Sequence, residues 1–333
     1  MNSRLKIATA VISLVLVLWH LSAAENGEEV KFIAELPTPG EYTLFANGGW
    51  DGNWFVGYKH RWVSELPPVT DNWYAGVYLG AKLGRALTAE QIREIKTKRT
   101  GKQNPDTGPY RILIGISDSP GQKPTVSKLL VMTDNIPLEG SGMSAVEGIS
   151  DSRWFWVKVD KSMLITDKPN YVHVWSDDEG LDASDVAPVL AGGLGSNKNT
   201  NSYLVKGEKE DEIRNIKYFE PAIAIKLVGK NPPRPDIDIT AFEQHPVRPQ
   251  RYLVRTSVTG RRIMEVWVQI FDGSEWKDTG WPVTRPPYDI VFDYSKLPPG
   301  GYRLRCRVEN WWGEVSYTAM REFRIENEEK AAK

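Results

Sequence analysis

The sequence predicts an all-β protein built from two β-sandwiches in tandem, and two observations support this class. From residue 30 to 228, and again from 236 to 326, short apolar or alternating runs are separated by Gly, Pro, Asn and Asp, which is typical of strands joined by turns. Between these regions, three prolines fall within residues 229–235, and such a cluster stiffens the chain into an extended linker.

The N-terminal residues predict export. Arg4 and Lys6 precede an apolar run over 7–21, and residues 22–24 are small, as a cleavage site requires. Because the run is shorter than the roughly 20 residues that cross a bilayer, we interpret 1–24 as a cleaved signal peptide, with a retained anchor as the alternative. The protein is then expected to be secreted or at the cell surface, with a periplasmic location also open, and to have no membrane span after cleavage.

Residues 30–228 are expected to form a jelly-roll-like β-sandwich, because about eight candidate strands suit that architecture. One helix is expected at 88–99, where Thr88 and Gln91 form a capping-box pattern. The polar segment 178–215, punctuated by Gly and Asn, is expected to run over the surface as a long loop. The candidate strands are 42–46, 54–63, 73–83, 110–117, 128–132, 154–160, 170–177 and 222–227.

Residues 236–327 are expected to form an immunoglobulin-like sandwich, because six or seven strands with turns about every ten residues fit that fold. In the clearest strand, apolar side chains including Leu304 and Cys306 alternate with three arginines and Glu309, which predicts one buried and one solvated face. As the only cysteine, Cys306 leaves no partner for an intramolecular disulfide, and we expect it to be a buried apolar residue. The candidate strands are 237–241, 252–258, 265–271, 288–292, 301–309 and 317–325.

Two stretches carry resemblances to known families. Leu-Pro-Pro-Gly-Gly-Tyr-Arg-Leu at 297–304, followed by the turn at 307–316, resembles the end of bacterial Ig-like and fibronectin type III-like domains, although two tryptophans fill the turn here. Such domains are commonly spacers or ligand-contact modules on exported proteins. More loosely, the runs at 154–159 and 171–176 look like paired strands of jelly-roll carbohydrate-binding modules.

The first aromatic-rich stretch, residues 48–74, contains the main candidate binding site. On a strand at 54–63, the rings of Trp54, Tyr58 and Trp62 would share a core face, whereas Trp50 lies in a turn-forming sequence where its ring would be exposed. Exposed rings serve as platforms for pyranose faces, and neighbouring short polar groups can bind hydroxyls. The candidate ligand-binding residues here are Trp50, Asp51, Asn53, Asp71, Asn72 and Trp73; the alternative is that the polar ones cap turns.

The second aromatic candidate is the adjacent pair Trp311 and Trp312. A tight turn between two strands rarely buries two neighbouring indoles, so we expect at least one to contact a ligand, a partner or the neighbouring domain.

An acidic segment follows the strand at 170–177. Carboxylate oxygens are the ligands that Ca²⁺ requires, and exported sandwiches use such ions to fix loops, so a calcium site is one interpretation. The other is a solvated acidic loop, because the spacing is not that of an EF-hand. The candidate ligands are Asp177, Asp178, Glu179, Asp182 and Asp185.

No catalytic motif appears. The histidines after the signal segment, His60, His173 and His245, fit neither a zinc-protease spacing nor a nucleophile elbow, and His173 is expected to be a hydrogen-bonded core imidazole. No catalytic residue and no cofactor other than calcium is therefore predicted. Lys plus Arg (42) and Asp plus Glu (43) nearly cancel, which argues against nucleic acid as a partner.

Together these observations predict an exported, non-catalytic binding protein that recognises carbohydrate through surface aromatics of the first sandwich. A structural or adhesive surface component that self-associates or binds a surface protein is the alternative, and a polysaccharide-acting enzyme is a third hypothesis.

Overall fold

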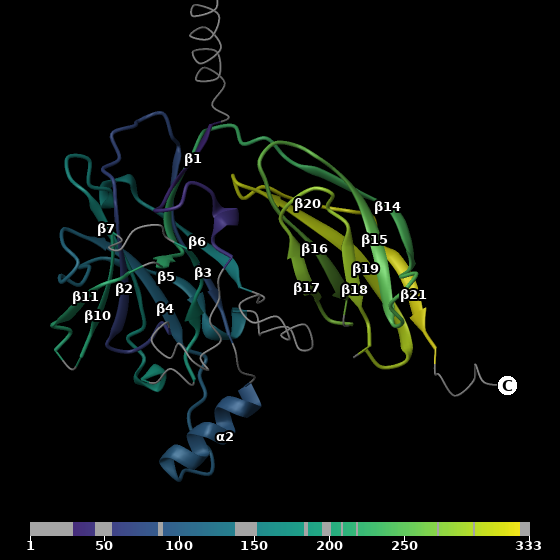
Figure 1. The fold of residues 1–333 in the computed structure, drawn as a ribbon, viewed down its shortest axis with the longest axis horizontal. Coiled ribbons are helices and arrows are strands. Elements are labelled where there is room, and N and C mark those ends of the chain that lie inside the picture. The colour runs from purple at the N-terminus through teal and green to yellow at the C-terminus, as the bar shows by residue number, and fades with distance from the viewer. Residues whose placement is uncertain are drawn as a thin grey trace, which may run out of the picture.

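A computed structural model describes residues 29–43, 55–85, 89–136, 152–182, 186–194, 201–207, 209–217, 219–271, 273–295 and 297–326. The predicted signal peptide, 1–24, lies outside these ranges. Two bodies built almost entirely of strands lie side by side, so the predicted all-β sandwich class is confirmed (Figure 1). Within the described ranges, no helix combines the length and the apolar character needed to cross a bilayer.

The first sandwich is made of two antiparallel sheets. In the five-stranded sheet the order is β1 (Val30–Ile33), β13 (Ile223–Val228), β3 (Gly76–Gly84) and β6 (Arg153–Val159), and β8 (Val189–Leu190) also pairs with β3. In the six-stranded sheet it is β11 (Glu212–Asn215), β10 (Ser202–Lys206), β2 (His60–Leu66), β7 (Asn170–Trp175), β4 (Arg111–Ser117) and β5 (Ser127–Met132).

The apolar faces of these two sheets form one core, in which Trp62, Leu79 and Ile225 are almost fully buried. A small ribbon of β9 (Gly192–Leu194) and β12 (Phe219–Pro221) completes this body. Four single-turn 3-10 helices, η1 (Pro39–Glu41), η2 (Thr133–Asn135), η3 (Lys161–Met163) and η4 (Glu179–Leu181), lie in its connections.

The second sandwich is made of a three-stranded and a five-stranded sheet. The first has the order β14 (Asp236–Gln244), β15 (Arg251–Thr259) and β18 (Ile290–Asp293). The second has β17 (Trp276–Val283), β16 (Ile263–Phe271) and β19 (Gly300–Asn310), with β20 (Val315–Tyr317) and β21 (Arg321–Ile325) both pairing with β19.

Strand β19 has the predicted alternation. Leu304, Cys306 and Val308 are fully buried in the core of the second sandwich, while the arginines between them face outward. Burial raises the pKa of the Cys306 thiol to about 12, so the thiol stays protonated at neutral pH. Cys306 is thus the buried apolar residue that the sequence predicts.

The predicted helix at 88–99 corresponds to α2 (Ala89–Thr100), which projects from one end of the first sandwich (Figure 1). Ile92 is buried, and the Lys96 ammonium donates to the Asp106 carbonyl (2.6 Å) and also bonds the Tyr110 hydroxyl. These contacts attach an otherwise solvated helix to the sandwich.

Two predictions about the first sandwich are wrong. The segment 178–215 is not a plain surface loop, because it contains β8, β9, β10 and β11, and β10 pairs with β2 inside the six-stranded sheet. In addition, no strand starts at Tyr42, whose side chain is fully buried after η1 and whose hydroxyl accepts a hydrogen bond from the Leu36 amide (2.9 Å). Both segments mix small polar and apolar residues, so their burial comes from tertiary contacts rather than from a regular pattern.

The two sandwiches touch along one side. Phe32 and Trp154 of the first pack with Met264 and Trp311 of the second. The Arg262 guanidinium donates to the Val30 carbonyl (2.7 Å), which bonds the second sandwich to the first strand of the chain.

Candidate functional site

The predicted binding residues of the first sandwich do not gather into an open site within the described residues. Asp71 forms an ion pair with Lys31 (2.5 Å), and the half-buried ring of Trp73 packs on the core and lies edge-to-face with Tyr74 at 6.0 Å. Asn72 is exposed. Trp50, Asp51 and Asn53 lie outside the described residues.

The tryptophan pair at 311–312 lies between the two sandwiches. Trp312 is only 5% exposed and packs against Val30 and Val228 of the first sandwich, so the expectation that at least one indole contacts the neighbouring domain is confirmed. Trp311 packs against the Phe32 ring at 6.1 Å. The first sandwich supplies the apolar surface that covers these indoles.

The acidic segment is divided among basic partners. Asp177 pairs with Lys123 (2.8 Å) and Asp182 pairs with Arg99 (2.8 Å). Asp178 accepts a hydrogen bond from the Arg111 amide (2.6 Å), while Glu179 is exposed in η4 and Asp185 lies outside the described residues. Among the residues with a described placement, no group of three or more His, Cys, Asp or Glu side chains could hold a metal ion. The calcium site stays a prediction.

A buried Ser–His pair lies in the six-stranded sheet, and its hydrogen bonds have a fixed direction. The Arg61 guanidinium, which can only donate, lies 2.6 Å from Nδ1 of His173, so Nδ1 is the acceptor. Burial, with Arg61 beside it, lowers the His173 pKa to about 2, so the neutral ring carries its proton on Nε2. That nitrogen donates to Ser117 Oγ (2.6 Å), which itself donates to the Ser119 carbonyl (2.7 Å).

This direction is opposite to that of a catalytic dyad. A nucleophilic serine must donate its proton to the histidine, whereas Ser117 accepts from His173. The pair instead completes a buried network in which Arg61 also donates to the carbonyls of the 120–122 loop. His173 is therefore the hydrogen-bonded core imidazole predicted from the sequence.

The outer face of the five-stranded sheet in the second sandwich carries a different arrangement, which we call the arginine–aromatic strip. Its members alternate between guanidinium groups and rings on neighbouring strands. The Arg305 guanidinium lies between two rings, 4.3 Å from the centre of Trp276 and 4.0 Å from that of Tyr317. The Arg303 guanidinium lies 4.3 Å from the centre of Phe271. The strip consists of Phe271, Trp276, Arg303, Arg305 and Tyr317.

The register of the sheet produces this strip. Phe271 pairs with Arg303 and with Trp276, so side chains from three strands meet in one row on the same face. Arg305 follows Arg303 by two residues on β19 and lies in the next row. Tyr317 is 49% exposed, so its ring is open to solvent as well as stacked on Arg305.

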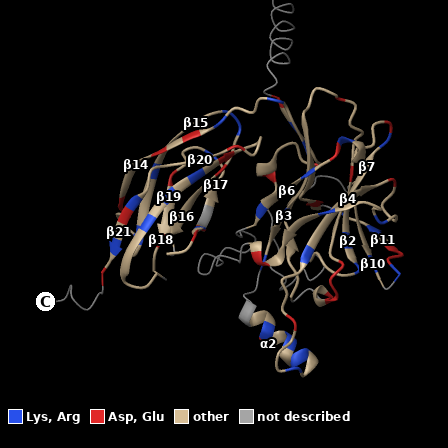
Figure 2. Ribbon diagram, turned by 180° about the vertical axis from the view of Figure 1, so that it is seen from behind, with Lys and Arg blue, Asp and Glu red and all other residues tan. Residues whose placement is uncertain are grey.

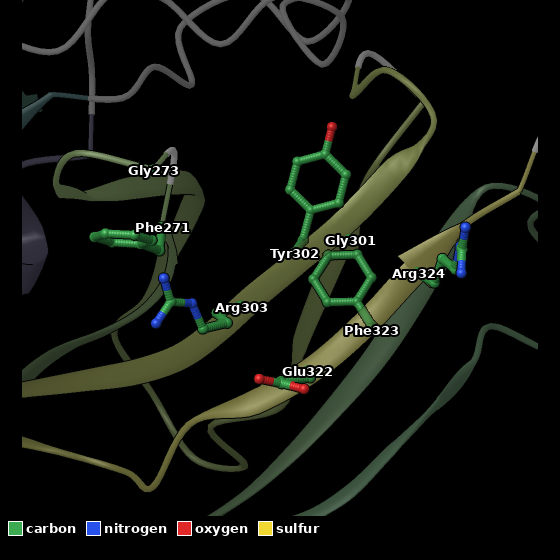
Figure 3. Close-up of a pocket in the computed structure, with 8 residues that line it drawn as sticks. All are labelled: Phe271, Gly273, Gly301, Tyr302, Arg303, Glu322, Phe323 and Arg324. Carbon is green, nitrogen blue, oxygen red and sulfur yellow. The ribbon is translucent and has the colours of Figure 1, made fainter.

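A groove of about 680 Å³ lies at the end of the strip (Figure 3). Gly301 opens it, because a side chain here would meet no atom within 4 Å. Arg324 on β21 lies opposite Gly301, and Glu322 lies opposite Arg303. The groove is lined by Phe271, Gly273, Gly301, Tyr302, Arg303, Glu322, Phe323 and Arg324.

Polar contacts fix the strip from below. Arg305 Nε donates to Gln269 (2.7 Å), and Gln269 donates to Asp278 (2.7 Å). Asp278 in turn pairs with Arg153 of the first sandwich (2.8 Å). The hydrogen bond to Gln269 holds one edge of the Arg305 guanidinium, and the rings of Trp276 and Tyr317 cover its two faces. The position of the guanidinium is therefore strongly constrained.

This surface was not predicted from the sequence. The alternation of β19 placed its arginines on a solvated face, which is correct for Arg303 but not for Arg307, whose side chain is only 12% exposed among Glu265, Asp278 and Glu309. The signal that could have found the site is the absence of a side chain at Gly301, together with rings at Phe271 and Trp276 just before and after a turn. These features come together only because β16 pairs with β19, and the sequence of a single strand does not reveal that pairing.

Comparisons with known proteins identify no family. No family model and no curated protein matches the chain. Solved structures with a likeness include the Endo-D glycoside hydrolase domain from Streptococcus pneumoniae R6 (13% identity, 79% of this chain and 31% of that one, TM-score 0.30). Another is a β-glucuronidase from Ruminococcus gnavus (11% identity, 88% and 40%, TM-score 0.20). The chain spans under half the length of either protein, and TM-scores this low assign neither family nor activity.

Proposed function

We propose that this protein is an exported, non-catalytic carbohydrate-binding protein whose ligand lies along the arginine–aromatic strip. The observation that carries the proposal is the stacking of Arg305 between Trp276 and Tyr317 beside an open groove. Pyranose rings have apolar faces that stack on aromatic side chains, and hydroxyl groups at their edges that bond charged side chains. The strip offers both kinds of contact on one face.

The groove supports the same assignment. Glu322 can accept hydrogen bonds from sugar hydroxyls, while Arg303 and Arg324 can donate to ring and hydroxyl oxygens. All three are exposed at the groove. Most of the residues that line the groove come from two paired strands, β19 and β21 (Figure 3).

A non-catalytic role is supported by the hydrogen bonds of the buried Ser–His pair. Its serine accepts a hydrogen bond from the histidine and donates its own to a backbone carbonyl, so the pair does not supply an activated nucleophile. We therefore expect that no reducing ends are released when the protein is incubated with a polysaccharide that it binds. Release of reducing ends that an active-site substitution abolishes would contradict this part of it.

The test is retention of the mature protein on a panel of insoluble polysaccharides. The double variant Trp276→Ala/Tyr317→Ala is expected to lose about tenfold or more in affinity for any polysaccharide that retains the native protein, because both stacking rings are gone. Trp73→Ala is the matched aromatic variant in the first sandwich and is expected to bind normally.

The opposite result would place the ligand-binding site on the first sandwich. If Trp73→Ala abolishes retention and Trp276→Ala/Tyr317→Ala does not, the ligand lies on the first sandwich, as the sequence analysis predicts. If no polysaccharide or glycan array retains the native protein, the carbohydrate function itself is wrong.

A further inference from the structure

We infer that the carbohydrate carries carboxylate groups, and that Arg303 and Arg324 bind them. This inference rests on the function proposed above and names the chemical class of its ligand. It starts from the charges around the groove. Among the residues that line it, Arg303 and Arg324 contribute two cations and Glu322 contributes one carboxylate, and basic residues are spaced along β19 and β21 (Figure 2).

The two arginines of the groove lack protein counter-ions. In the part of the chain that the structure describes, neither Arg303 nor Arg324 forms an ion pair, although Glu322 lies directly across the strand pair from Arg303. Elsewhere on the second sandwich, cross-strand arginines are paired: Arg251 with Asp293 (2.9 Å) and Arg255 with Glu243 (3.3 Å). The positive charge at the groove is therefore available to a ligand.

Arg303 is also pre-organised. It stacks on Phe271, so one face of its guanidinium is already covered (Figure 3). A side chain held in this way loses less conformational freedom on binding than a free one. Arginine presents a planar fork of donors that matches the two oxygens of a carboxylate.

The surrounding groups favour a sugar acid over other anions. Glu322 repels closely spaced negative charges, so a ligand with one carboxylate per sugar and hydroxyls between suits the groove better than a chain of phosphates. A nucleic acid would also stack on rings and bind arginines. However, a nucleic acid carries a phosphate at every nucleotide, so the repulsion from Glu322 disfavours it in the same way.

The test compares acidic polysaccharides with their neutral counterparts by isothermal titration calorimetry on the mature protein. Polygalacturonate, alginate and hyaluronate are each titrated beside the same polymer with its carboxyl groups reduced to alcohols. We expect at least one acidic form to bind, its reduced form to bind about tenfold or more weakly, and the affinity to fall as salt is raised.

Arg303→Gln/Arg324→Gln tests the residues. It should bind the acidic polymer about tenfold or more weakly than the native protein. Arg248→Gln/Arg285→Gln is the matched control, since it removes the same charge from two exposed arginines in turns outside the strip. Equal melting temperatures of the two variants will show that both are folded.

Each outcome separates this inference from the proposed function. If reduced and acidic polymers bind equally and the groove variant binds like its control, while Trp276→Ala/Tyr317→Ala does not bind, the carboxylate inference is overturned and carbohydrate binding stands. If a thymidine oligonucleotide competes as well as the acidic polymer, the site is a general polyanion site and the inference is also overturned. If no polymer binds, both fail.

Discussion

His173 illustrates how the first sandwich accommodates a polar residue in its interior. Its two ring nitrogens are both bonded, one to the guanidinium of Arg61 and the other to the hydroxyl of Ser117. Protonation would place a second cation beside Arg61 in a dry environment. The neutral ring therefore stabilises the fold and does not act as a catalytic base.

The ring of His173 should not titrate between about pH 4 and about pH 8. Because its pKa is lowered to about 2, nitrogen-15 NMR should show an unprotonated Nδ1 and a protonated Nε2 throughout this range. A ring that titrates near pH 6 would contradict the buried network. Ser117→Ala should keep the tautomer but destabilise the fold, since Nε2–H loses its acceptor.

The buried carboxyl group of Glu220 predicts that the free energy of unfolding depends on pH. Its side chain is 4% exposed on β12, and burial, with the nearby Glu35 carboxylate, raises its pKa to about 7. The unfolded chain releases this proton near pH 4.5, whereas the folded protein holds it to about 7. The folded state binds more protons in that window, so its contribution to stability falls as pH rises from 4.5 to 7.

Glu220→Gln should therefore stabilise the protein at pH 8, by up to about 3 kcal/mol, and have little effect at pH 4.5. Urea unfolding at the two pH values measures this difference. Glu94→Gln, on the exposed face of α2, is the control and should change neither value. Destabilisation of Glu220→Gln at pH 8 would show that the carboxylate is ionised and bound to a partner.

At the residue scale, the sequence predicted environments that depend on strand alternation. Cys306 and His173 were placed correctly because each follows a period of two within its own strand. Arg61 was missed, because alternation assigns it to a solvated face, whereas the loop 120–122 folds over the guanidinium and buries it completely. This loop lies far from Arg61 in the sequence, so the alternation within one strand does not reveal it.

At the scale of a single element, β19 combines a core face with the face that we propose binds the ligand. Its inward residues form the core of the second sandwich, while its outward residues carry the strip. The two faces can therefore be changed independently, because alternate residues along a strand point to opposite sides.

Gly301→Val should fill the groove without harming the fold. A side chain at Gly301 meets no atom within 4 Å, and valine favours extended backbone, so the melting temperature should stay the same or rise slightly. Affinity for the carbohydrate should fall about tenfold or more, because the side chain occupies the ligand's space. Calorimetric titration and thermal melts measure the two quantities.

The neighbouring position provides the control for this variant. A Cβ at Gly300 points to the opposite side of β19 from Gly301 and would make only an ordinary contact with the Tyr302 ring, at 3.7 Å. Gly300→Ala should leave binding unchanged. Undiminished binding by Gly301→Val would mean that the groove is not the site.

Elements themselves were predicted unevenly. Helix α2 and strand β19 were close to their predicted ranges, since each has a regular period and clear ends. Strand β2 begins at His60 rather than at 54, and β10 was taken for loop. Both strands lie inside the six-stranded sheet with most residues covered on both faces, so the alternation that marks a half-exposed strand is weak in them.

At the scale of the whole molecule, the tryptophan pair at 311–312 indicated a contact with the neighbouring domain, but no local pattern revealed which residues of the first sandwich it meets. The residues that meet there, such as Phe32 and Trp311, are far apart in the sequence. The linker and the two runs of strands were predictable from composition, but the matching of two surfaces was not. Lys226 lies in this contact, 4.3 Å from the centre of the Trp156 ring, and burial lowers its pKa to about 8.

Trp311→Ala/Trp312→Ala should loosen this contact. Removing a buried tryptophan costs about 3–5 kcal/mol, and here the loss falls on the surface that joins the two bodies. Differential scanning calorimetry should resolve two transitions in the variant where the native protein gives one. Trp276→Ala, on the strip, is the control and should keep a single transition. Two transitions in the native protein, unchanged in the variant, would contradict a stabilising joint.

The hydrogen-bonded series Arg305, Gln269, Asp278 and Arg153 links the strip with the first sandwich. A ligand that packed on the strip and stabilised Arg305 would also stabilise the partners behind it, so ligand binding and the contact between the two bodies would share a coupling free energy. Coupling of this kind is reciprocal. If ligand binding stabilises the contact between the sandwiches, a force that pulls the sandwiches apart must lower the affinity for the ligand. On a stretched surface polymer, the protein would release its ligand as its two halves separate.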